Sequence, residues 1–490
     1  MKILFIDNFS FNFGVASISS VLKQSGHNVE LMYYPFFKLR GIDIYRDPGN
    51  YFSFEKISNE VIAKKPDIIG FSVFSANYMF YRHAAAAIRS KIEIPILVGG
   101  VFPTMSSEFF INNSCCDVVF RGEAELVITE LMEKMVARKY HDVPNIVYRN
   151  KEGYPVFNKM DSFVVDLDNL PFYDKNLCPS SPITLNMATS RGCVFSCAYC
   201  SSGKYTRITN RQGDGKVRKR SVYRVIEEIK QALSIRPYKS ISFWDDFFIS
   251  SPKWLLDFTV EYCKEINLPY SCVAFPGTVN KNTASLLAQS GCRFIYMGFQ
   301  TANNEYKKNV LRRNETKEQI AKAIGYLREN GVKFGLDLIF NFPGETKKYI
   351  EETLDFFVDN RIKWASIYFL NYYPDSYITK YAYENNFISF EQFSKIMKNE
   401  LIGDQAYGGT IIDKGKVKEQ VRYALLFRLL SLFPCKWIKW LYKKNIYKLF
   451  PVNRYFYYAI TLLTVLLKQG FLGILLFIKP YSQFKKSSRI

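Results

Sequence analysis

Three cysteines in one short run constrain this chain more than any other feature of its sequence. Cys193, Cys197 and Cys200 are spaced C-x3-C-x2-C, and the aromatic Tyr199 precedes the third thiol. Three thiolates on one loop can hold three irons of a cubane cluster and leave the fourth iron open to another ligand. A structural zinc site is the alternative, but zinc takes four ligands, commonly as two C-x2-C pairs, and no second pair exists here. The spacing therefore predicts a loop that carries a [4Fe-4S] cluster.

Length, charge and cysteine content narrow the setting. The 490 residues are enough for several domains with large cores, and the net charge of +21 suggests nucleic acid, anionic lipid or phosphorylated partners. Three histidines leave little scope for histidine chemistry, and ten unevenly placed cysteines do not form a disulfide framework. The first residues predict a strand and not a signal peptide. We expect a cytoplasmic protein in a reducing compartment.

The first part of the chain, residues 1–140, alternates short apolar runs with helical segments. This pattern predicts a doubly wound parallel sheet, with strands at 2–7, 28–33, 66–72, 95–100 and 117–120. Ligands of such sheets bind beyond the carboxyl ends of the strands. Residues 141–180 are predicted to be a connector that begins with a hairpin over a polar turn.

The second part, residues 181–385, repeats the alternation of strand and helix. The predicted strands are 183–188, 240–244, 270–275, 294–298, 333–340 and 364–370. The cysteine run follows the first of them, at the end of the fold where loops of barrel enzymes carry the chemistry. The basic run 211–220 is expected to be a solvated loop.

The cysteine run resembles the signature of the radical S-adenosylmethionine (SAM) superfamily, and the later landmarks 243–248, 297–301 and 342–346 resemble that family in order. The resemblance implies a partial (β/α)6 barrel and a [4Fe-4S] cluster on Cys193, Cys197 and Cys200. It implies SAM on the open iron, cleaved to a 5'-deoxyadenosyl radical. The residues it places at SAM are Tyr199, Asp245 and Gln300. Gln300 stands where relatives usually carry a carboxylate, and Asp245 has the alternative role of capping the next helix.

The N-terminal part resembles the cobalamin-binding domain that often precedes radical SAM barrels. The similarity lies in residues 69–72, 98–104 and 117–125. It implies cobalamin contacts at Ser72, Gly99, Gly100, Gly122 and Glu123. The sequence departs from the family at Phe102, where histidine is common, and the pattern D-x-H-x-x-G is absent. No histidine ligand for cobalt is therefore evident, and a domain that has lost its cobalamin is the alternative.

The C-terminal region, residues 386–490, has a different composition. Aromatic and basic residues interleave, and the apolar runs 459–467 and 471–478 are interrupted by Lys468. A spanning helix needs about 20 apolar residues, and a charge at its centre is costly. The pattern favours a helical region that rests on an anionic membrane, at the inner face of the cytoplasmic membrane. A helical subdomain packed on the barrel is the alternative.

Together these features predict a cobalamin-associated radical SAM enzyme that modifies an unactivated carbon, with C-methylation favoured. The alternatives are radical cyclisation, C–C coupling or oxidation of a lipid-like or isoprenoid-like substrate without methyl transfer. A non-catalytic Fe–S or corrinoid sensor is a third reading, against which the missing fourth cysteine argues. The expected partners are a small-molecule or lipid-like substrate and an electron donor such as a flavodoxin or ferredoxin. The sequence carries no dedicated nucleic-acid module.

Overall fold

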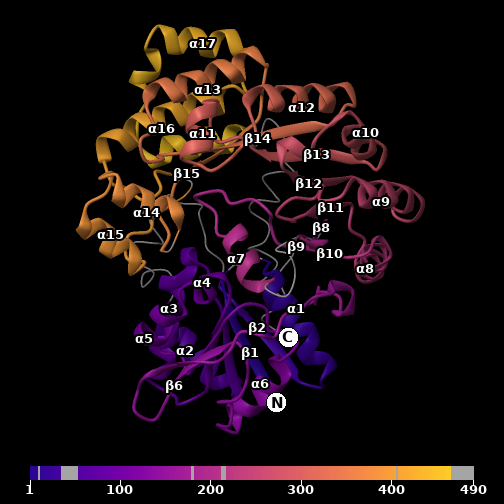
Figure 1. Cartoon of the computed structure of the whole chain (residues 1–490), viewed down its shortest axis with the longest axis vertical. Coiled ribbons are helices and arrows are strands. Elements are labelled where there is room, and N and C mark those ends of the chain that lie inside the picture. Colours follow the sequence, from indigo (N-terminus) through magenta and orange to yellow (C-terminus); the bar gives the residue numbers. More distant parts are fainter. Residues whose placement is uncertain are drawn as a thin grey trace.

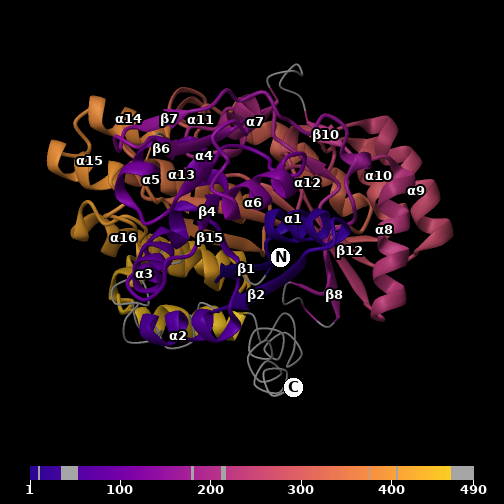
Figure 2. The same cartoon turned by 90° about the horizontal axis from the view of Figure 1, so that it is seen from below.

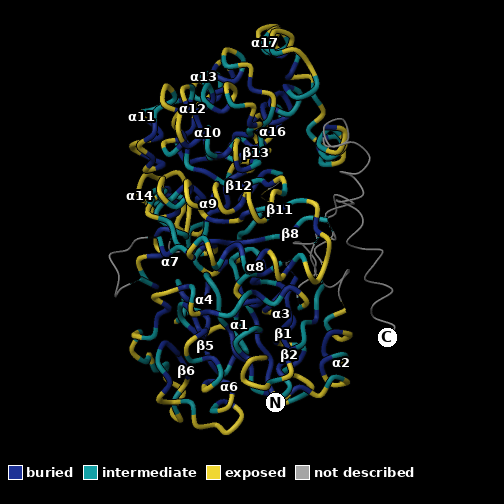
Figure 3. Tube along the Cα trace, turned by 90° about the vertical axis from the view of Figure 1, so that its right-hand side faces the viewer, coloured by how far each residue is buried: buried dark blue, intermediate teal, exposed yellow. Residues whose placement is uncertain are grey.

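The fold is built around two sheets, one in each half of the chain (Figure 1). The computed structural model describes residues 1–8, 11–34, 53–177, 181, 183–210, 217–374, 376–403, 405 and 407–464. Apolar side chains form separate cores around the two sheets, and exposed residues lie on the outer surface (Figure 3). The predicted α/β architecture is confirmed.

The N-terminal sheet has seven strands in the order β2-β1-β3-β4-β5-β6-β7. They are β1 (Lys2–Asp7), β2 (Asn28–Tyr33), β3 (Ile68–Ser72), β4 (Ile96–Gly99), β5 (Val118–Phe120), β6 (Ile146–Arg149) and β7 (Pro155–Phe157). The first five pair in parallel, and β6 and β7 form the predicted hairpin, which extends the sheet in the antiparallel sense. The central strands are apolar along their whole length because helices cover both faces.

Two layers of helices enclose this sheet (Figure 2). One face is covered by α1 (Phe13–Gln24) and α6 (Ile128–Val136). The other face is covered by α2 (Phe54–Lys64), α3 (Tyr78–Arg89) and α5 (Ser107–Asn113). The short helix α4 (Val101–Met105) follows β4 directly, so it lies at the carboxyl edge of the sheet.

The second sheet has six parallel strands in the order β15-β14-β13-β12-β11-β8. They are β8 (Thr184–Met187), β11 (Ser240–Phe243), β12 (Tyr270–Ala274), β13 (Cys292–Gly298), β14 (Lys333–Phe340) and β15 (Ala365–Phe369). The helices packed outside it are α8 (Val222–Ile235), α9 (Pro252–Glu265), α10 (Lys281–Gln289), α12 (Lys317–Glu329) and α13 (Lys347–Asp359). All six predicted strands are present, and β8 and β15 form the two edges.

The edge at β15 is covered by the chain that follows it. Phe369 donates its N–H to the carbonyl of Gln405 at 2.8 Å, and Thr410 donates to the carbonyl of Leu370 at 3.0 Å. Gln405 and Thr410 thus satisfy backbone groups that an open edge strand would expose.

The C-terminal helices pack on the barrel. Residues of α16 (Lys414–Leu429) and α17 (Cys435–Lys443), among them Val421, Leu425 and Ile438, belong to the same core as the barrel strands. The packed-subdomain alternative therefore holds for the described residues of this region. Lys468 and the apolar run 471–478 lie outside the described residues. No described helix combines the length and the apolar character that a membrane span requires.

Candidate active site

The carboxyl ends of the two sheets face each other, and the cysteine loop lies between them (Figure 1). The loop leaves β8, forms the short strand β9 (Ser190–Arg191) and ends at α7 (Ser202–Thr209). β9 pairs with β10 (Arg218–Lys219). Thr206 Oγ1 of α7 accepts a hydrogen bond from the N–H of Cys193 at 2.8 Å, which fixes the first cysteine against the helix.

The three thiols differ in exposure. Cys193 and Cys197 are partly buried, whereas Cys200 is exposed. Burial raises the pKa of the Cys193 thiol to about 12. Burial also raises the pKa of Cys197, although the nearby Arg313 guanidinium opposes it. A metal removes such protons by binding the thiolates, so the donor set fits an iron–sulfur cluster. Among the described residues no three His, Cys, Asp or Glu side chains are gathered closely enough to hold a metal ion, and the ligand assignment stays a prediction.

Tyr199 and Arg313 form a contact that sequence reasoning missed. The buried Arg313 donates to Tyr199 Oη at 3.1 Å, to the Gly298 carbonyl at 2.9 Å and to Glu315 Oε1 at 2.5 Å. Its Nη1 also lies 4.0 Å from Cys197 Sγ. The guanidinium therefore ties the cysteine loop to the end of β13 and places a permanent positive charge beside one of the predicted ligands.

Asp245, which follows β11, holds the start of the cysteine loop. Its carboxylate accepts hydrogen bonds from the Thr189 N–H at 3.1 Å, from Thr189 Oγ1 at 2.7 Å and from Ser190 Oγ. The side chain is only 3 % exposed. It acts on the loop rather than on the next helix, and its predicted contact with SAM stays a prediction.

Gln300 lies at the carboxyl end of β13 in the left-handed backbone region, with φ of 66°. The residue is buried and its Oε1 has no hydrogen-bond partner. An unpartnered buried acceptor is costly unless a ligand supplies a donor. SAM offers an ammonium and two ribose hydroxyls, so Gln300 fits the predicted SAM site.

A partly buried carboxyl group, Asp337 of β14, stands next to this position. Asp337 pairs in register with Gly298, and its carbonyl accepts the N–H groups of Phe299 and Gln300 at 3.0 and 2.9 Å. Burial raises the pKa of its side chain to about 6, against the opposing effects of Ser366 and Arg313. No motif in the sequence marked Asp337. Only the alternation of β14, which turns it away from the outer core, could have indicated it.

The five residues predicted for cobalamin converge on one cavity. Ser72, Gly99, Gly100, Gly122 and Glu123 all line a space of about 420 Å³ between the N-terminal sheet and the cysteine loop. A side chain on Gly99 would have room, with 3.8 Å from its Cβ to Phe120. Gly100 has φ of 111°, and a Cβ there would lie 2.8 Å from the backbone of Val73. The edge is thus lined by small residues that allow a large ligand to approach the backbone.

Glu123 and its neighbour Glu125 also join the two halves of the protein. Glu123 receives two hydrogen bonds of 2.7 Å from Arg218, and Glu125 receives one of 2.6 Å from Arg191. Arg218 and Arg220 are buried, so the expectation of a solvated loop is wrong for these two residues. Their burial follows from pairing, since Arg220 bonds Glu228 of α8. Residues 211–216 of that run lie outside the described residues.

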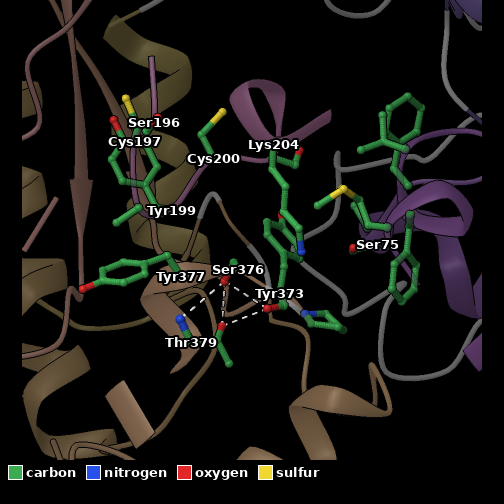
Figure 4. A pocket seen from close by; sticks show the side chains of 18 of the residues that line it. Ser75, Ser196, Cys197, Tyr199, Cys200, Lys204, Tyr373, Ser376, Tyr377 and Thr379 are labelled. Carbon is green, nitrogen blue, oxygen red and sulfur yellow. Dashed lines mark hydrogen bonds between the residues drawn. The ribbon is translucent and has the colours of Figure 1, made fainter. Parts of the chain in front are cut away.

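A larger cavity of about 960 Å³ adjoins the cysteine loop on its other side (Figure 4). Cys197, Tyr199 and Cys200 form one wall, and Phe74 and Phe102 form part of the wall that belongs to the N-terminal sheet. No histidine is found among the described residues that line either cavity. The glycine-lined cavity suits a corrinoid because its small residues allow close approach to the backbone, and any cobalt there has no histidine ligand among the described residues.

The chain matches two family models. The radical SAM superfamily model matches residues 187–357, and the B12-binding domain model matches residues 6–132. These matches contain the cysteine loop and all five residues of the glycine-lined edge.

The chain is also similar to named proteins. It is 28 % identical over 350 residues to an uncharacterized methyltransferase of Pyrococcus horikoshii, covering 69 % of this chain and 73 % of that protein. It is 22 % identical to the bacteriochlorophyllide d C-12(1)-methyltransferase of Chlorobaculum tepidum, covering 57 % of this chain and 58 % of that protein.

Among solved structures, the radical SAM methyltransferase TsrM of Kitasatospora setae, with cobalamin and a [4Fe-4S] cluster bound, superposes with a TM-score of 0.59 at 15 % identity. This match covers 77 % of this chain and 73 % of that chain and shows a shared fold. The chain therefore contains a radical SAM domain preceded by a B12-binding domain, and its cofactors are SAM, a [4Fe-4S] cluster and cobalamin.

Proposed function

We propose that this enzyme transfers a methyl group to an unactivated carbon. The observation that carries the proposal is the place of the cysteine loop, which forms a wall of both the glycine-lined cavity and the larger cavity. When bound, SAM and the cluster supply a radical that abstracts a hydrogen atom from the substrate, and cobalamin supplies the methyl group that the resulting carbon radical receives. The methyltransferases among the similar proteins support methylation over cyclisation, coupling or oxidation.

The chain's own residues position and shield this chemistry. Cys193, Cys197 and Cys200 hold the cluster, while Asp245 and Arg313 fix the loop from both ends. Tyr199 and Gln300 contact SAM, and Ser72, Gly99, Gly100, Gly122 and Glu123 form the cobalamin side. The aromatic rings of the larger cavity exclude water, and this protects reactive intermediates from side reactions.

The experiment uses SAM with a deuterated methyl group. Reconstituted enzyme with hydroxocobalamin, a reductant and a small-molecule extract should form both 5'-deoxyadenosine and S-adenosylhomocysteine, together with a product heavier by one labelled methyl group. Omission of cobalamin should stop the formation of S-adenosylhomocysteine. Formation of 5'-deoxyadenosine with an unlabelled product would contradict methyl transfer and favour cyclisation or oxidation.

The partners follow from the same chemistry. A one-electron donor, such as a flavodoxin or ferredoxin, delivers the electron that starts each cycle. The exposed Cys200 offers a short route from the surface to the cluster, and the basic chain suits an acidic donor.

A peripheral contact with the inner, cytoplasmic face of an anionic membrane is the remaining part of the proposal. Trp437 and Trp440 of α17 are 63 % and 53 % exposed, and Leu449 is 81 % exposed. Exposed lysines surround them, at positions 436, 443, 444 and 448. Aromatic rings at headgroup level with lysines around them are typical of interfacial binding.

A further inference from the structure

The interior of the larger cavity is aromatic. Its lining includes Phe11, Phe13, Phe74, Phe102, Tyr199, Tyr373, Tyr377 and Phe393. Tyr373 reaches in from the loop after β15, opposite the wall that carries Cys197 and Cys200 (Figure 4). An occupant of this space therefore has an apolar body that lies beside the cysteine loop.

The opening of the same cavity is cationic. Lys204, Arg207, Arg312 and Lys380 line it, and all four are exposed. They come from α7, from the segment before α12 and from α14 (Tyr377–Glu384). No described residue of the lining is acidic. The cavity thus combines an apolar interior with a positively charged opening.

Two of these cations are held in place, and no described residue neutralises them. Arg207 donates to Ser196 Oγ at 3.0 Å, and the Arg312 guanidinium carbon lies 3.2 Å from the centre of the Tyr377 ring. Arg207, Arg312 and Lys380 take part in none of the ion pairs found between described residues. A fixed guanidinium with a free charge binds carboxylate or phosphate well, because little side-chain entropy is lost.

We propose that the substrate is an amphiphilic anion. Its apolar body fills the aromatic interior, and its carboxylate or phosphate group is held at the opening by Arg207, Arg312 and Lys380. This inference rests on the proposed function, because it assigns the cavity to the substrate of that reaction. Because Arg207 bonds Ser196 of the cysteine loop, an anion anchored at the opening holds the substrate next to that loop, so that binding energy orients an unreactive carbon.

Isothermal titration with four matched amphiphiles tests the proposal. Full-length protein, reconstituted with iron, sulfide and hydroxocobalamin, is titrated with dodecanoate, dodecyl phosphate, dodecanol and dodecyltrimethylammonium below their micelle concentrations. We expect both anions to bind about tenfold or more tightly than the alcohol, as one charge-assisted contact allows, and the cation to bind most weakly. The tighter of the two anions identifies carboxylate or phosphate as the preferred group.

Two double variants locate the effect. Arg312→Gln with Lys380→Gln should lose the preference for anions and retain the affinity for dodecanol. Lys436→Gln with Lys443→Gln, which removes exposed charges of α17, should keep the preference. Equal affinity for anions and alcohol would overturn the proposal, and so would a preference that disappears only in the α17 variant.

Cobalamin is the alternative ligand for these cations, because it carries a phosphate group. If Arg312→Gln with Lys380→Gln released the corrinoid during gel filtration, the cations would serve the cofactor and the proposal would fail. Wild-type protein that retains corrinoid and cleaves SAM but shows no preference for anions would contradict this inference alone. Protein that neither retains corrinoid nor cleaves SAM contradicts the proposed function, and the assignment of the bound anion as substrate falls with it.

Discussion

The two sheet edges that face each other differ in how they are built to bind a ligand. The barrel edge carries charged and polar side chains, several of which already have partners, such as Asp245 with Thr189 and Arg313 with Tyr199. The edge of the N-terminal sheet is lined by Ser72, Gly99 and Gly100 and encloses open space. One edge is preorganised by the residues it contains, and the other receives its ligand because side chains are missing.

The difference predicts that the barrel edge is broken by removing a side chain. Cys193→Ala should abolish reductive cleavage of SAM, because two thiolates cannot hold the cluster. The assay is 5'-deoxyadenosine formed with dithionite under anaerobic conditions. Cys263→Ala, at an exposed position on α9, should keep full activity. Continued formation of 5'-deoxyadenosine by Cys193→Ala would contradict the assignment of Cys193 as a cluster ligand.

The N-terminal edge should be broken by adding a side chain. Gly99→Leu should prevent retention of corrinoid in gel filtration, because the new side chain enters the 420 Å³ cavity. Gly325→Leu on α12, where a Cβ meets nothing within 4 Å, is the matched control and should retain it. Gly100 is a poorer test, since a substitution there strains the backbone. Normal corrinoid binding by Gly99→Leu would place the cofactor elsewhere.

The contact between the two edges has its own energetic signature. Glu123→Gln breaks the ion pair with the buried Arg218, which has two hydrogen bonds, and loss of one partner of such a pair costs about 3–5 kcal/mol in the free energy of unfolding. Glu130→Gln removes an exposed pair with Lys134 and should cost about 0–1 kcal/mol. Urea unfolding of apoprotein measures both. Loss of corrinoid with unchanged stability would instead make Glu123 a direct ligand of cobalamin.

The strands and the cysteine loop could be predicted from the sequence, but the buried charged contacts could not. The strands followed from apolar runs, and the cysteine loop from a local motif. Arg313, Asp337 and Arg218 were missed because each becomes significant only through a residue distant in sequence: Cys197, Gly298 and Glu123. The acidic and basic partners of a buried pair carry no local pattern, whereas a glycine edge at least repeats a familiar spacing.

Acid should weaken the contact between the halves. Burial raises the pKa of Glu125, but Arg191 and Ser17 outweigh it, so that its pKa lies below the ordinary value of 4.5. The resulting stabilisation is complete above pH 4.5 and is lost as pH falls toward the lowered pKa. Unfolding midpoints should therefore drop in this window for the wild type and drop less for Glu125→Gln. Parallel curves for the two proteins would contradict the role of this pair.

The smallest effect is expected at α17, far from both edges. Full-length protein should sediment with anionic liposomes, and replacing Trp437 and Trp440 by alanine should reduce the bound fraction several-fold, since each ring buries apolar area at the interface. Salt should weaken the remaining binding. Tyr223→Ala, an exposed aromatic residue on α8, is the control. Equal sedimentation of all three proteins would show that α17 does not contact the membrane.

The central claim is that one chain holds a cluster and a corrinoid on two facing edges. Combined determination of iron, sulfide and corrinoid in anaerobically reconstituted protein, with its ultraviolet–visible spectrum, tests this most directly. We expect about four irons and one corrinoid per chain. We also expect Cys193→Ala to lose the iron and keep the corrinoid, and Gly99→Leu to lose the corrinoid and keep the iron. Iron without any retained corrinoid, or loss of both groups in either variant, would contradict it.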